Sequence, residues 1–268
     1  MESFIKMYKT GEIISNRCLK GDYYQAVFYA PEIAAAAVPG QFVHVQIAQM
    51  SANILRRPFS INNTDPAAGT VQITYKVVGS GTEVLSKLAP GVVCDLMGPL
   101  GNGYKMPAAD EIPVMIAGGY GTAAMFMLSK LAANKGVLLV GARGDADLIL
   151  LEDYQAQGTE VRVATNDGSV GTKGFVTVLL EDLLKNSEPG KKYRFYACGP
   201  TPMLMAAGKM LCDAGREDGE LSLDHVMCCG VGACFACVVK VKDGDSFRYA
   251  RSCSEGPVFT AGEVYYEN

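Results

Sequence analysis

Three things are scarce in this 268-residue sequence: long apolar runs, positive charge and histidine. No apolar run approaches the ~20 residues of a membrane-spanning helix, so we expect no membrane-embedded role. The net charge of −4 offers no basic surface for nucleic acid or an anionic membrane. The only two histidines, His44 and His225, are expected to be structural or solvated rather than catalytic.

The composition nevertheless supports well-packed cores. Hydrophobic residues make up 49% of the chain and charged residues 19%, which excludes a disordered protein. The length suits two or three domains. Glycine is frequent, and many of the 30 glycines fall in a few loops where phosphate binding would explain them.

The most informative pattern lies near the C-terminus, where four of the nine cysteines fall close together. Cys229, Cys234 and Cys237 form a Cys-x4-Cys-x2-Cys run, and Cys253 follows after fifteen residues. This is the spacing of a plant-type [2Fe–2S] site with four thiolate ligands. Small residues between the thiols let the backbone fold tightly and aim N–H groups at sulfur. The pattern therefore predicts a chain that moves electrons one at a time.

Zinc, a disulfide framework and simple burial are the competing interpretations of these cysteines. Zinc sites usually have two short knuckles separated by a longer stretch, which this run lacks. An odd cysteine count and the lack of a secretory signal argue against disulfides, and free thiols indicate the cytoplasm. Cys228 could replace Cys229 as a ligand; otherwise we expect it to face away. Three more cysteines are expected in cores: Cys18, Cys94 and Cys212.

Residues 1–103 predict a closed antiparallel β-barrel. Short segments rich in Val, Ile and Tyr are separated by Gly or Pro, and one helix, Thr82–Leu88, interrupts them with Thr82 as its N-cap. The expected strands are Glu12–Leu19, Tyr23–Tyr29, Phe42–Ile47, Val71–Val78 and Val92–Met97, with a further strand opening at Arg56–Ile61.

Residues 104–220 predict an α/β domain with a parallel sheet, after a linker at Tyr104–Glu111. The expected strands are Ile112–Ala117, Val137–Gly141, Glu160–Ala164 and Tyr193–Ala197. The expected helices are Thr122–Asn134, Asp147–Gln157, Gly174–Lys185 and Thr201–Ala214. Residues 221–268 then form a small cysteine module, which makes the chain a multi-domain protein.

Two tracts in the barrel suit a flavin. Arg57 can pair with a pyrophosphate, Phe59 can stack on a flat ring and Ser60 can hydrogen-bond it. Downstream, the glycines before Thr82 would place a helix N-terminus at a phosphate. A solvated barrel edge is the plainer interpretation of the basic and aromatic tract.

Three loops of the α/β domain are expected to meet at one edge of the sheet, where ligands bind in such folds. They are the glycine turn Gly118-Gly119-Tyr120-Gly121, the loop Asn166–Ser169 and the turn Cys198-Gly199-Pro200. This arrangement predicts a dinucleotide site, although a tight βα turn without a ligand remains open. Cys198 could touch the nicotinamide or pack in the core. Arg143 is followed by Asp145 and Asp147, and one arginine beside two acids favours NADH over NADPH.

The order of these motifs resembles the ferredoxin–NADP reductase superfamily and, within it, the electron-transfer subunits of NAD-dependent dihydroorotate dehydrogenase. The most similar stretches are LRRPFSI, YKVVGSGT, LMGPLGNGY, ATNDGSVGTKG and CGVGACFACV followed by CSEGPVF. The resemblance implies one FAD, one [2Fe–2S] cluster and NAD(H) as co-substrate. It implies that Cys229, Cys234, Cys237 and Cys253 bind the cluster. It implies FAD contacts at Arg57, Pro58, Phe59, Ser60, Thr74, Tyr75, Lys76, Gly81 and Thr82.

The resemblance also implies a partner. A catalytic TIM barrel alone needs about 250 residues, so dihydroorotate oxidation would require a second, FMN-containing subunit, with two copies of each chain. An apolar patch near Cys229–Ala236 is expected to meet it. The chain departs from the family pattern at the glycine turn, where Ala117, Tyr120 and Ala124 stand, and Asp224 replaces a common glutamate.

Two other functions remain open. One is a diaphorase-type subunit of a hydrogenase or of an NADH–ferredoxin oxidoreductase. The other is a metal-binding interaction module without enzymatic activity. No catalytic acid or base is expected, because hydride transfer to a flavin requires none.

Overall fold

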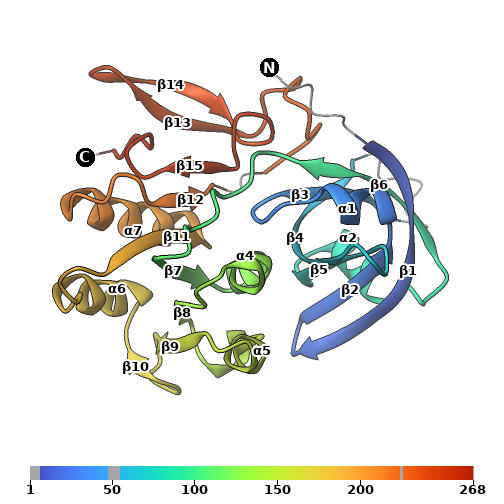
Figure 1. The fold of residues 1–268 in the computed structure, drawn as a ribbon. Helices are drawn as coiled ribbons and strands as arrows, with labels where there is room; N and C mark the ends of the chain where they lie inside the picture. The colour runs from blue at the N-terminus through green and yellow to red at the C-terminus, as the bar shows by residue number, and fades with distance from the viewer. Residues whose placement is uncertain (1–6, 48–54, 224–225, 268) are drawn as a thin grey trace.

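The computed structural model describes residues 7–47, 55–223 and 226–267. Figure 1 shows a barrel beside an α/β domain, with the cysteine module along one side of both. None of the helices in these ranges has the length and apolar character needed to cross a bilayer.

Six strands close the barrel in the order β1-β2-β5-β4-β3-β6. Alternate side chains point inward and form its core, including Phe28, Val43 and Ile73, all fully buried. The elements are β1 (Met7–Lys20), β2 (Tyr23–Tyr29), α1 (Pro31–Ala36), β3 (Phe42–Gln46), β4 (Arg57–Asp65), β5 (Thr70–Lys76), α2 (Ser80–Ser86) and β6 (Val93–Leu100).

The second body is a seven-stranded sheet in the order β10-β9-β8-β7-β11-β12-β15. All pairs are parallel except the last, β12 with β15. The strands are β7 (Glu111–Gly118), β8 (Val137–Ala142), β9 (Glu160–Thr165), β10 (Thr172–Lys173), β11 (Lys192–Cys198), β12 (Glu220–Ser222) and β15 (Val258–Thr260).

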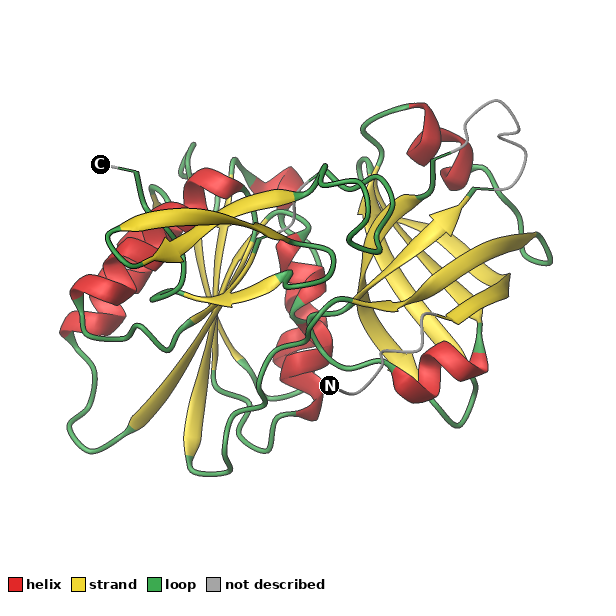
Figure 2. Ribbon diagram, turned by 90° about the horizontal axis from the view of Figure 1, so that it is seen from above, coloured by secondary structure: helices red, strands yellow, loops and turns green. Residues whose placement is uncertain are grey.

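Helices cover both faces of this sheet, as Figure 2 shows. On one face α6 (Val176–Lys185) and α7 (Thr201–Asp213) pack on β7, β8 and β11. On the other face, toward the barrel, lie α3 (Gly121–Ala124), α4 (Phe126–Leu131) and α5 (Leu151–Ala156). Burial on both faces explains the near-continuous apolar runs of the central strands.

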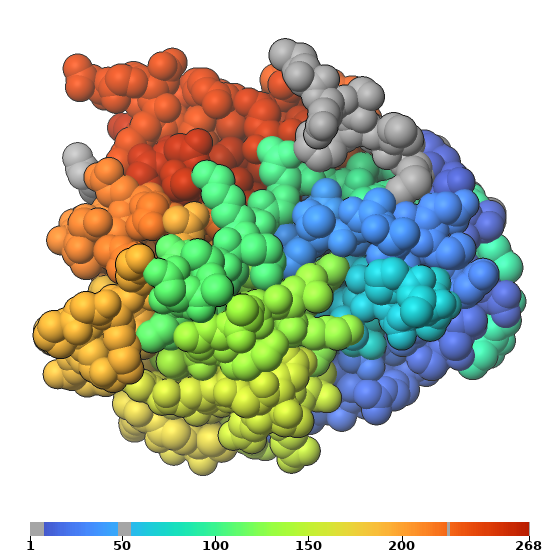
Figure 3. Space-filling model, viewed as in Figure 1, coloured from blue at the N-terminus to red at the C-terminus, as the bar shows by residue number. Residues whose placement is uncertain are grey.

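The cysteine module connects the two bodies. Its hairpin, β13 (Val238–Asp243) with β14 (Ser246–Arg251), is a separate two-stranded sheet, whereas its last strand β15 extends the large sheet. Met227, Cys237 and Cys253 pack against Phe42 and Met97 of the barrel. Figure 3 shows its red and orange surface beside the α/β domain and reaching the barrel. Strand β12 runs across the expected boundary at residue 220.

The predicted architecture is confirmed: a closed antiparallel barrel, a parallel sheet and a C-terminal module. The helices expected at 174–185 and 201–214 match α6 and α7 to within two residues, whereas the other helix predictions were wrong in detail. Helix α1 was missed, the helix expected at 122–134 breaks at Met125 and ends at Leu131, and the one expected at 147–157 begins only at Leu151. The N-cap of α2 is Gly79 rather than Thr82, because the Thr82 hydroxyl reaches back from the third helical position to the Gly79 N–H.

Candidate functional site

A cavity of about 600 Å³ opens on the barrel side of the interface between the two bodies. All nine barrel residues expected at the flavin line it: Arg57, Pro58, Phe59, Ser60, Thr74, Tyr75, Lys76, Gly81 and Thr82. They come from β4, β5 and α2, which the closed barrel brings to one rim. A Cβ on Gly81 would lie 2.9 Å from Nε of Arg57, so glycine lets this guanidinium rest against the start of α2.

A second cavity, of about 550 Å³, lies at the carboxyl ends of β7, β8, β9 and β11. Gly118, Gly119 and Pro200 line it, together with Arg143 and Asn166. This is the edge at which parallel α/β sheets bind nucleotides.

Three other residues expected at this edge lie just behind the cavity and shape it. A Cβ on Gly121 would stand 2.1 Å from the Cys198 carbonyl oxygen, and one on Gly199 would stand 2.7 Å from the Met203 methyl carbon. The Cys198 side chain is 1% exposed and packs with Tyr196 and Met115 in the core. The two glycines therefore allow the close approach of β7, β11 and their turns.

The two cavities adjoin, because Lys76 and Tyr120 line both. Asp147 fixes this junction: it accepts hydrogen bonds from Tyr23 (2.9 Å) and Lys76 (2.7 Å) of the barrel and from Arg143 (2.8 Å). The Arg143 guanidinium, with Lys76 and Tyr23, holds the pKa of Asp147 well below its usual range. Burial and the Asp147 carboxylate raise the pKa of Tyr23. One carboxylate thus joins barrel and α/β domain.

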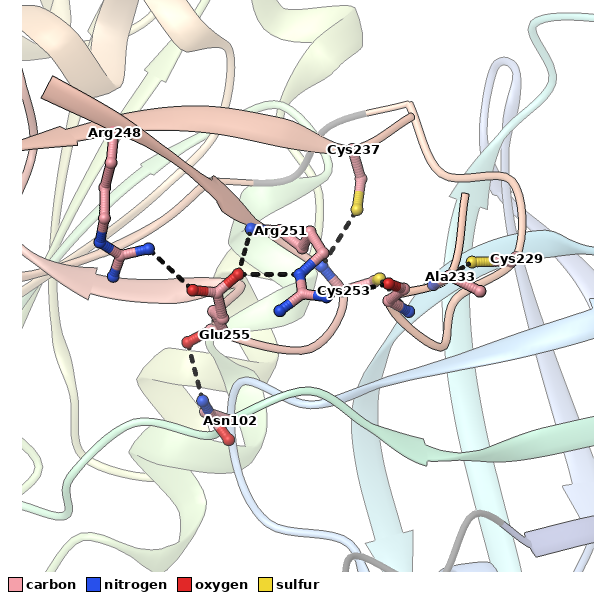
Figure 4. Close-up of polar contacts among 9 residues, drawn as sticks. Asn102, Cys229, Ala233, Cys237, Arg248, Arg251, Cys253 and Glu255 are labelled. Atoms are coloured by element: carbon pink, nitrogen blue, oxygen red, sulfur yellow. Dashed lines mark hydrogen bonds and ion pairs between the residues drawn. The ribbon is translucent and has the colours of Figure 1, made fainter. Parts of the chain in front are cut away.

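The cysteine loop surrounds its sulfur atoms with backbone donors. The N–H groups of Val231 and Ala233 lie 3.4 and 3.3 Å from the Cys229 sulfur. Gly232 donates to Cys253 (3.2 Å), and the Cys253 N–H donates to Cys237 (3.4 Å). Figure 4 shows Cys229, Cys237 and Cys253 gathered from separate parts of the module. Donors aimed at sulfur are what bound thiolates require.

The electrostatics of the loop favour at least one thiolate. Burial opposes ionisation of Cys229, but the N–H groups of Val231, Cys234 and Ala233 outweigh it and lower the pKa. Burial and the neighbouring Cys237 thiol raise the pKa of Cys253. An unloaded site of this kind therefore binds metal with release of protons.

The donor set fits a [2Fe–2S] cluster. In the described ranges, no three His, Cys, Asp or Glu side chains are arranged to hold a metal ion. A [2Fe–2S] cluster does not need such a triple, because two thiolates serve each iron. Cys237 and Cys253 are buried, Cys229 is half-buried and Cys234 is exposed.

The structure also places four cysteines that were not expected to bind the cluster. Cys228 is half-buried, and burial together with the neighbouring Cys234 thiol raises the pKa of its thiol. Cys18 is exposed on β1 rather than in a core, because that side of the strand faces solvent. Cys94 is buried as expected, and Cys212 is partly buried.

An ion pair between Arg251 and Glu255, called the ion-pair brace below, supports the cysteine loop. Arg251 contacts Glu255 (3.0 Å) and the Gly232 carbonyl (3.1 Å), and its guanidinium lies 5.0 Å from the centre of the Phe235 ring. Burial opposes ionisation of Glu255, but the N–H and guanidinium of Arg251, with Arg248, lower its pKa to about 2. Asn102, after β6, donates to the Glu255 carbonyl (2.8 Å) and ties the brace to the barrel (Figure 4).

Sequence reasoning missed several residues of these sites. Phe42, Val226 and Met227 line the flavin-side cavity but carry no motif. His44 was expected to be solvated or structural; it is fully buried, and burial lowers its pKa to about 4 with help from Arg56. His225 and Asp224 lie outside the described residues.

The barrel, the nucleotide-binding sheet and the thiol loop define a flavin- and iron–sulfur-containing oxidoreductase. Residues 11–104 match the oxidoreductase FAD-binding domain, and residues 224–265 match the iron–sulfur cluster binding domain of dihydroorotate dehydrogenase B. A solved NADH-dependent reduced ferredoxin–NADP oxidoreductase superposes with a TM-score of 0.78 at 27% identity, covering 96% of this chain and 90% of its own.

Curated relatives narrow the class further. The dihydroorotate dehydrogenase B (NAD(+)) electron transfer subunit of Desulforamulus reducens is 38% identical over 91% of this chain and 93% of its own. The corresponding subunit of Fusobacterium nucleatum is also 38% identical, over 92% of this chain and 94% of its own. The chain belongs to the family of dihydroorotate dehydrogenase B (NAD(+)) electron transfer subunits.

Proposed function

We propose that this chain collects electrons from NADH and delivers them singly to an FMN-containing subunit that oxidises or forms dihydroorotate. A bound flavin accepts a hydride and releases single electrons, and a [2Fe–2S] cluster carries one electron at a time. The observation that carries the proposal is continuity: the dinucleotide-side cavity shares Lys76 and Tyr120 with the flavin-side cavity. The latter is lined in turn by Phe42 and Met227, which pack against Cys237 and Cys253.

At the dinucleotide end, Gly118, Gly119 and Pro200 supply a backbone surface that a nicotinamide nucleotide can approach closely. This surface is supported by close packing directly beneath it, at Gly121, Gly199 and Cys198. Arg143 is engaged by Asp147 at 2.8 Å, which leaves it poorly placed to select a 2′-phosphate. This supports NADH as the co-substrate.

At the flavin, Arg57 and the start of α2 would neutralise the pyrophosphate. Phe59 and Tyr75, whose ring centroids are 5.7 Å apart, form an aromatic wall of the cavity, and Ser60, Thr74 and Thr82 add polar contacts. Lys76 stands at the junction, where its ammonium is held by the Asp147 carboxylate at 2.7 Å and lies over the Tyr23 ring. No residue in this arrangement has to move a proton for hydride transfer.

The partner would meet the cysteine loop. Phe235 lies between two cysteines with φ +56°, and its side chain is 59% exposed. Val226, 84% exposed, flanks the flavin-side cavity near the same loop. A left-handed conformation at a non-glycine residue costs of order 1–3 kcal/mol. Such strain is usually retained where the side chain has a function, which here would be contact with the partner. We infer an apolar contact with the catalytic subunit, two copies of each chain, and a cytoplasmic setting.

The first experiment is a visible spectrum of the anaerobically purified chain with flavin, iron and acid-labile sulfide assays. The proposal expects about one FAD, two irons and two sulfides per chain. Zinc in place of iron, or colourless protein, would exclude it. NADH-driven orotate reduction should then appear when the catalytic subunit is added.

Single substitutions separate the steps. Cys234→Ala should leave FAD reduction by NADH largely intact and abolish onward transfer, whereas Cys18→Ala, at an exposed thiol on β1, should change neither. Phe235→Ser should weaken binding of the catalytic subunit at least tenfold. Val178→Ser, at an exposed apolar position on α6 (45%), is its matched control.

The likeness to the NADH-dependent reduced ferredoxin–NADP oxidoreductase supports a second candidate, a subunit that exchanges electrons with ferredoxin. Rapid cluster oxidation by ferredoxin, with none by the dihydroorotate-oxidising subunit, would favour it.

A further inference from the structure

His44 is the least satisfied polar side chain near the proposed electron path. Its exposure is 0%, and neither ring nitrogen has a hydrogen-bond partner within the described part of the chain. Buried polar groups are nearly always paired, so an orphaned imidazole requires an explanation.

The position of His44 indicates where a partner would come from. Along β3, Val43 and Val45 point into the barrel core, so Phe42 and His44 share the outer side of the strand. The Phe42 and His44 rings are 5.6 Å apart. Phe42 lines the flavin-side cavity and packs against Cys237 and Cys253. His44 therefore stands between the flavin-side cavity and the cysteine loop.

Gly230 completes the enclosure. A Cβ on Gly230 would lie 2.9, 3.0 and 3.1 Å from Cε1, Nε2 and Nδ1 of His44, so the imidazole lies directly against the loop one residue after Cys229. Gly230 has φ +68°, a conformation that suits glycine. The loop and the strand are 186 positions apart in sequence, yet the space between the glycine and the imidazole is too small for a Cβ.

We propose that an imidazole N–H of His44 donates a hydrogen bond to a sulfur of the loaded cysteine site and so sets its reduction potential. The inference rests on the proposed function, since it requires a [2Fe–2S] cluster at these thiols. His44 is a positioning residue: it carries no electron and exchanges no proton. A donor to sulfur stabilises the more negative, reduced state, so His44 raises the potential. The barrel thereby tunes a site held by a different part of the chain.

Three substitutions test this. His44→Phe keeps a buried ring of similar size and removes both donors. His44→Asn places an amide N–H near the position of Nδ1, and His44→Gln places one near Nε2. The measurements are anaerobic potentiometric titrations of the cluster, with the flavin potential of the same sample as an internal reference.

A spectroscopic measurement identifies the donor directly. The chain has two histidines, so ¹⁵N-histidine labelling of untagged protein leaves His225 as the only other source of an imidazole signal. Pulsed EPR of the reduced cluster should show a nitrogen coupling that disappears in His44→Phe.

The inference expects the His44→Phe cluster potential to become more negative while the flavin potential stays fixed. It expects one amide variant, not both, to restore the wild-type value. Full iron content with unchanged potential and unchanged nitrogen coupling in His44→Phe overturns it. If His44→Phe holds no iron, the cluster potentials of His44→Asn and His44→Gln decide. Two potentials equal to that of the wild type overturn the inference, whereas a shift in only one of the two variants supports it. Absence of iron from the wild-type chain instead refutes the proposed function.

Discussion

Replacing Asp147 with asparagine should loosen the barrel from the α/β domain. Asp147 is 9% exposed and joins the two bodies through Tyr23 and Lys76, and it also holds Arg143. Asparagine keeps the shape and one acceptor oxygen but removes the charge. The substitution therefore tests the electrostatic part of the contact.

The magnitude follows from the exposure of the three partners. Arg143 is 77% exposed, so its ion pair contributes under about 1 kcal/mol. Lys76 is 21% exposed and Tyr23 is 3% exposed; hydrogen bonds to a charged group at such sites are worth about 1.5–3 kcal/mol each. Because asparagine still accepts one bond, we expect a loss of about 3 kcal/mol in the free energy of unfolding. For a chain of this size the melting temperature should fall by about 6–12 °C.

The pH dependence has a definite sign. The folded pKa of Asp147 lies below its unfolded value of about 3.9, so its contribution is complete above that pH and is lost as the pH falls below it. The difference in melting temperature between wild type and Asp147→Asn should be constant from pH 8 to about pH 5. It should shrink toward pH 3.

Thermal unfolding followed by circular dichroism measures both effects. Asp145→Asn is the matched control, because Asp145 also bridges to the barrel, at Lys20, but both side chains are exposed, 60% and 39%. It should cost under about 1 kcal/mol. An Asp147→Asn variant that melts within 2 °C of wild type, or no further below it than Asp145→Asn, would refute the reasoning.

Three further predictions follow from local geometry. Gly230→Ala adds a Cβ at φ +68° against the His44 ring and should lose iron and sulfide, whereas Gly244→Ala, at φ +59° with open space around it, should cost only about 1–2 kcal/mol in denaturant unfolding. Tyr120→Ala opens the junction of the two cavities and should raise oxygen consumption driven by NADH several-fold, with Tyr120→Phe near wild type. Lys135→Met removes an ammonium that donates to three carbonyls at the end of α4 and should destabilise the chain by about 1 kcal/mol.

Local patterns predicted the architecture and the cysteine site well. The Cys-x4-Cys-x2-Cys spacing needs only a few consecutive residues, and the family matches confirm that the chain has an FAD-binding domain and an iron–sulfur cluster binding domain. The individual ligands stay a prediction. The course of the helix expected at 122–134 was predicted poorly, because its break at Met125 and its end at Leu131 depend on packing and on capping by Lys135. The apolar periodicity alone does not contain that information.

Long-range contacts between individual side chains were not predicted. Asp147 accepts hydrogen bonds from Lys76 and Tyr23, which lie 71 and 124 positions away in the sequence. His44 and Gly230 are neighbours only in the folded chain, where the barrel is closed and the cysteine loop packs on its outer side. No spacing rule relates such residues, since tertiary packing alone brings them together.

The pairing of strand β15 limits how the iron–sulfur unit of this protein can be exchanged for another. Its antiparallel pairing with β12 places a piece of the C-terminal module inside the architecture of its neighbour. Deleting the module would remove β15 and two of the three residues of β12, which would leave β11 as an unpaired edge of the sheet and promote self-association. Engineers who wish to exchange the iron–sulfur unit for another must therefore graft the hairpin loop alone and retain the closing strand.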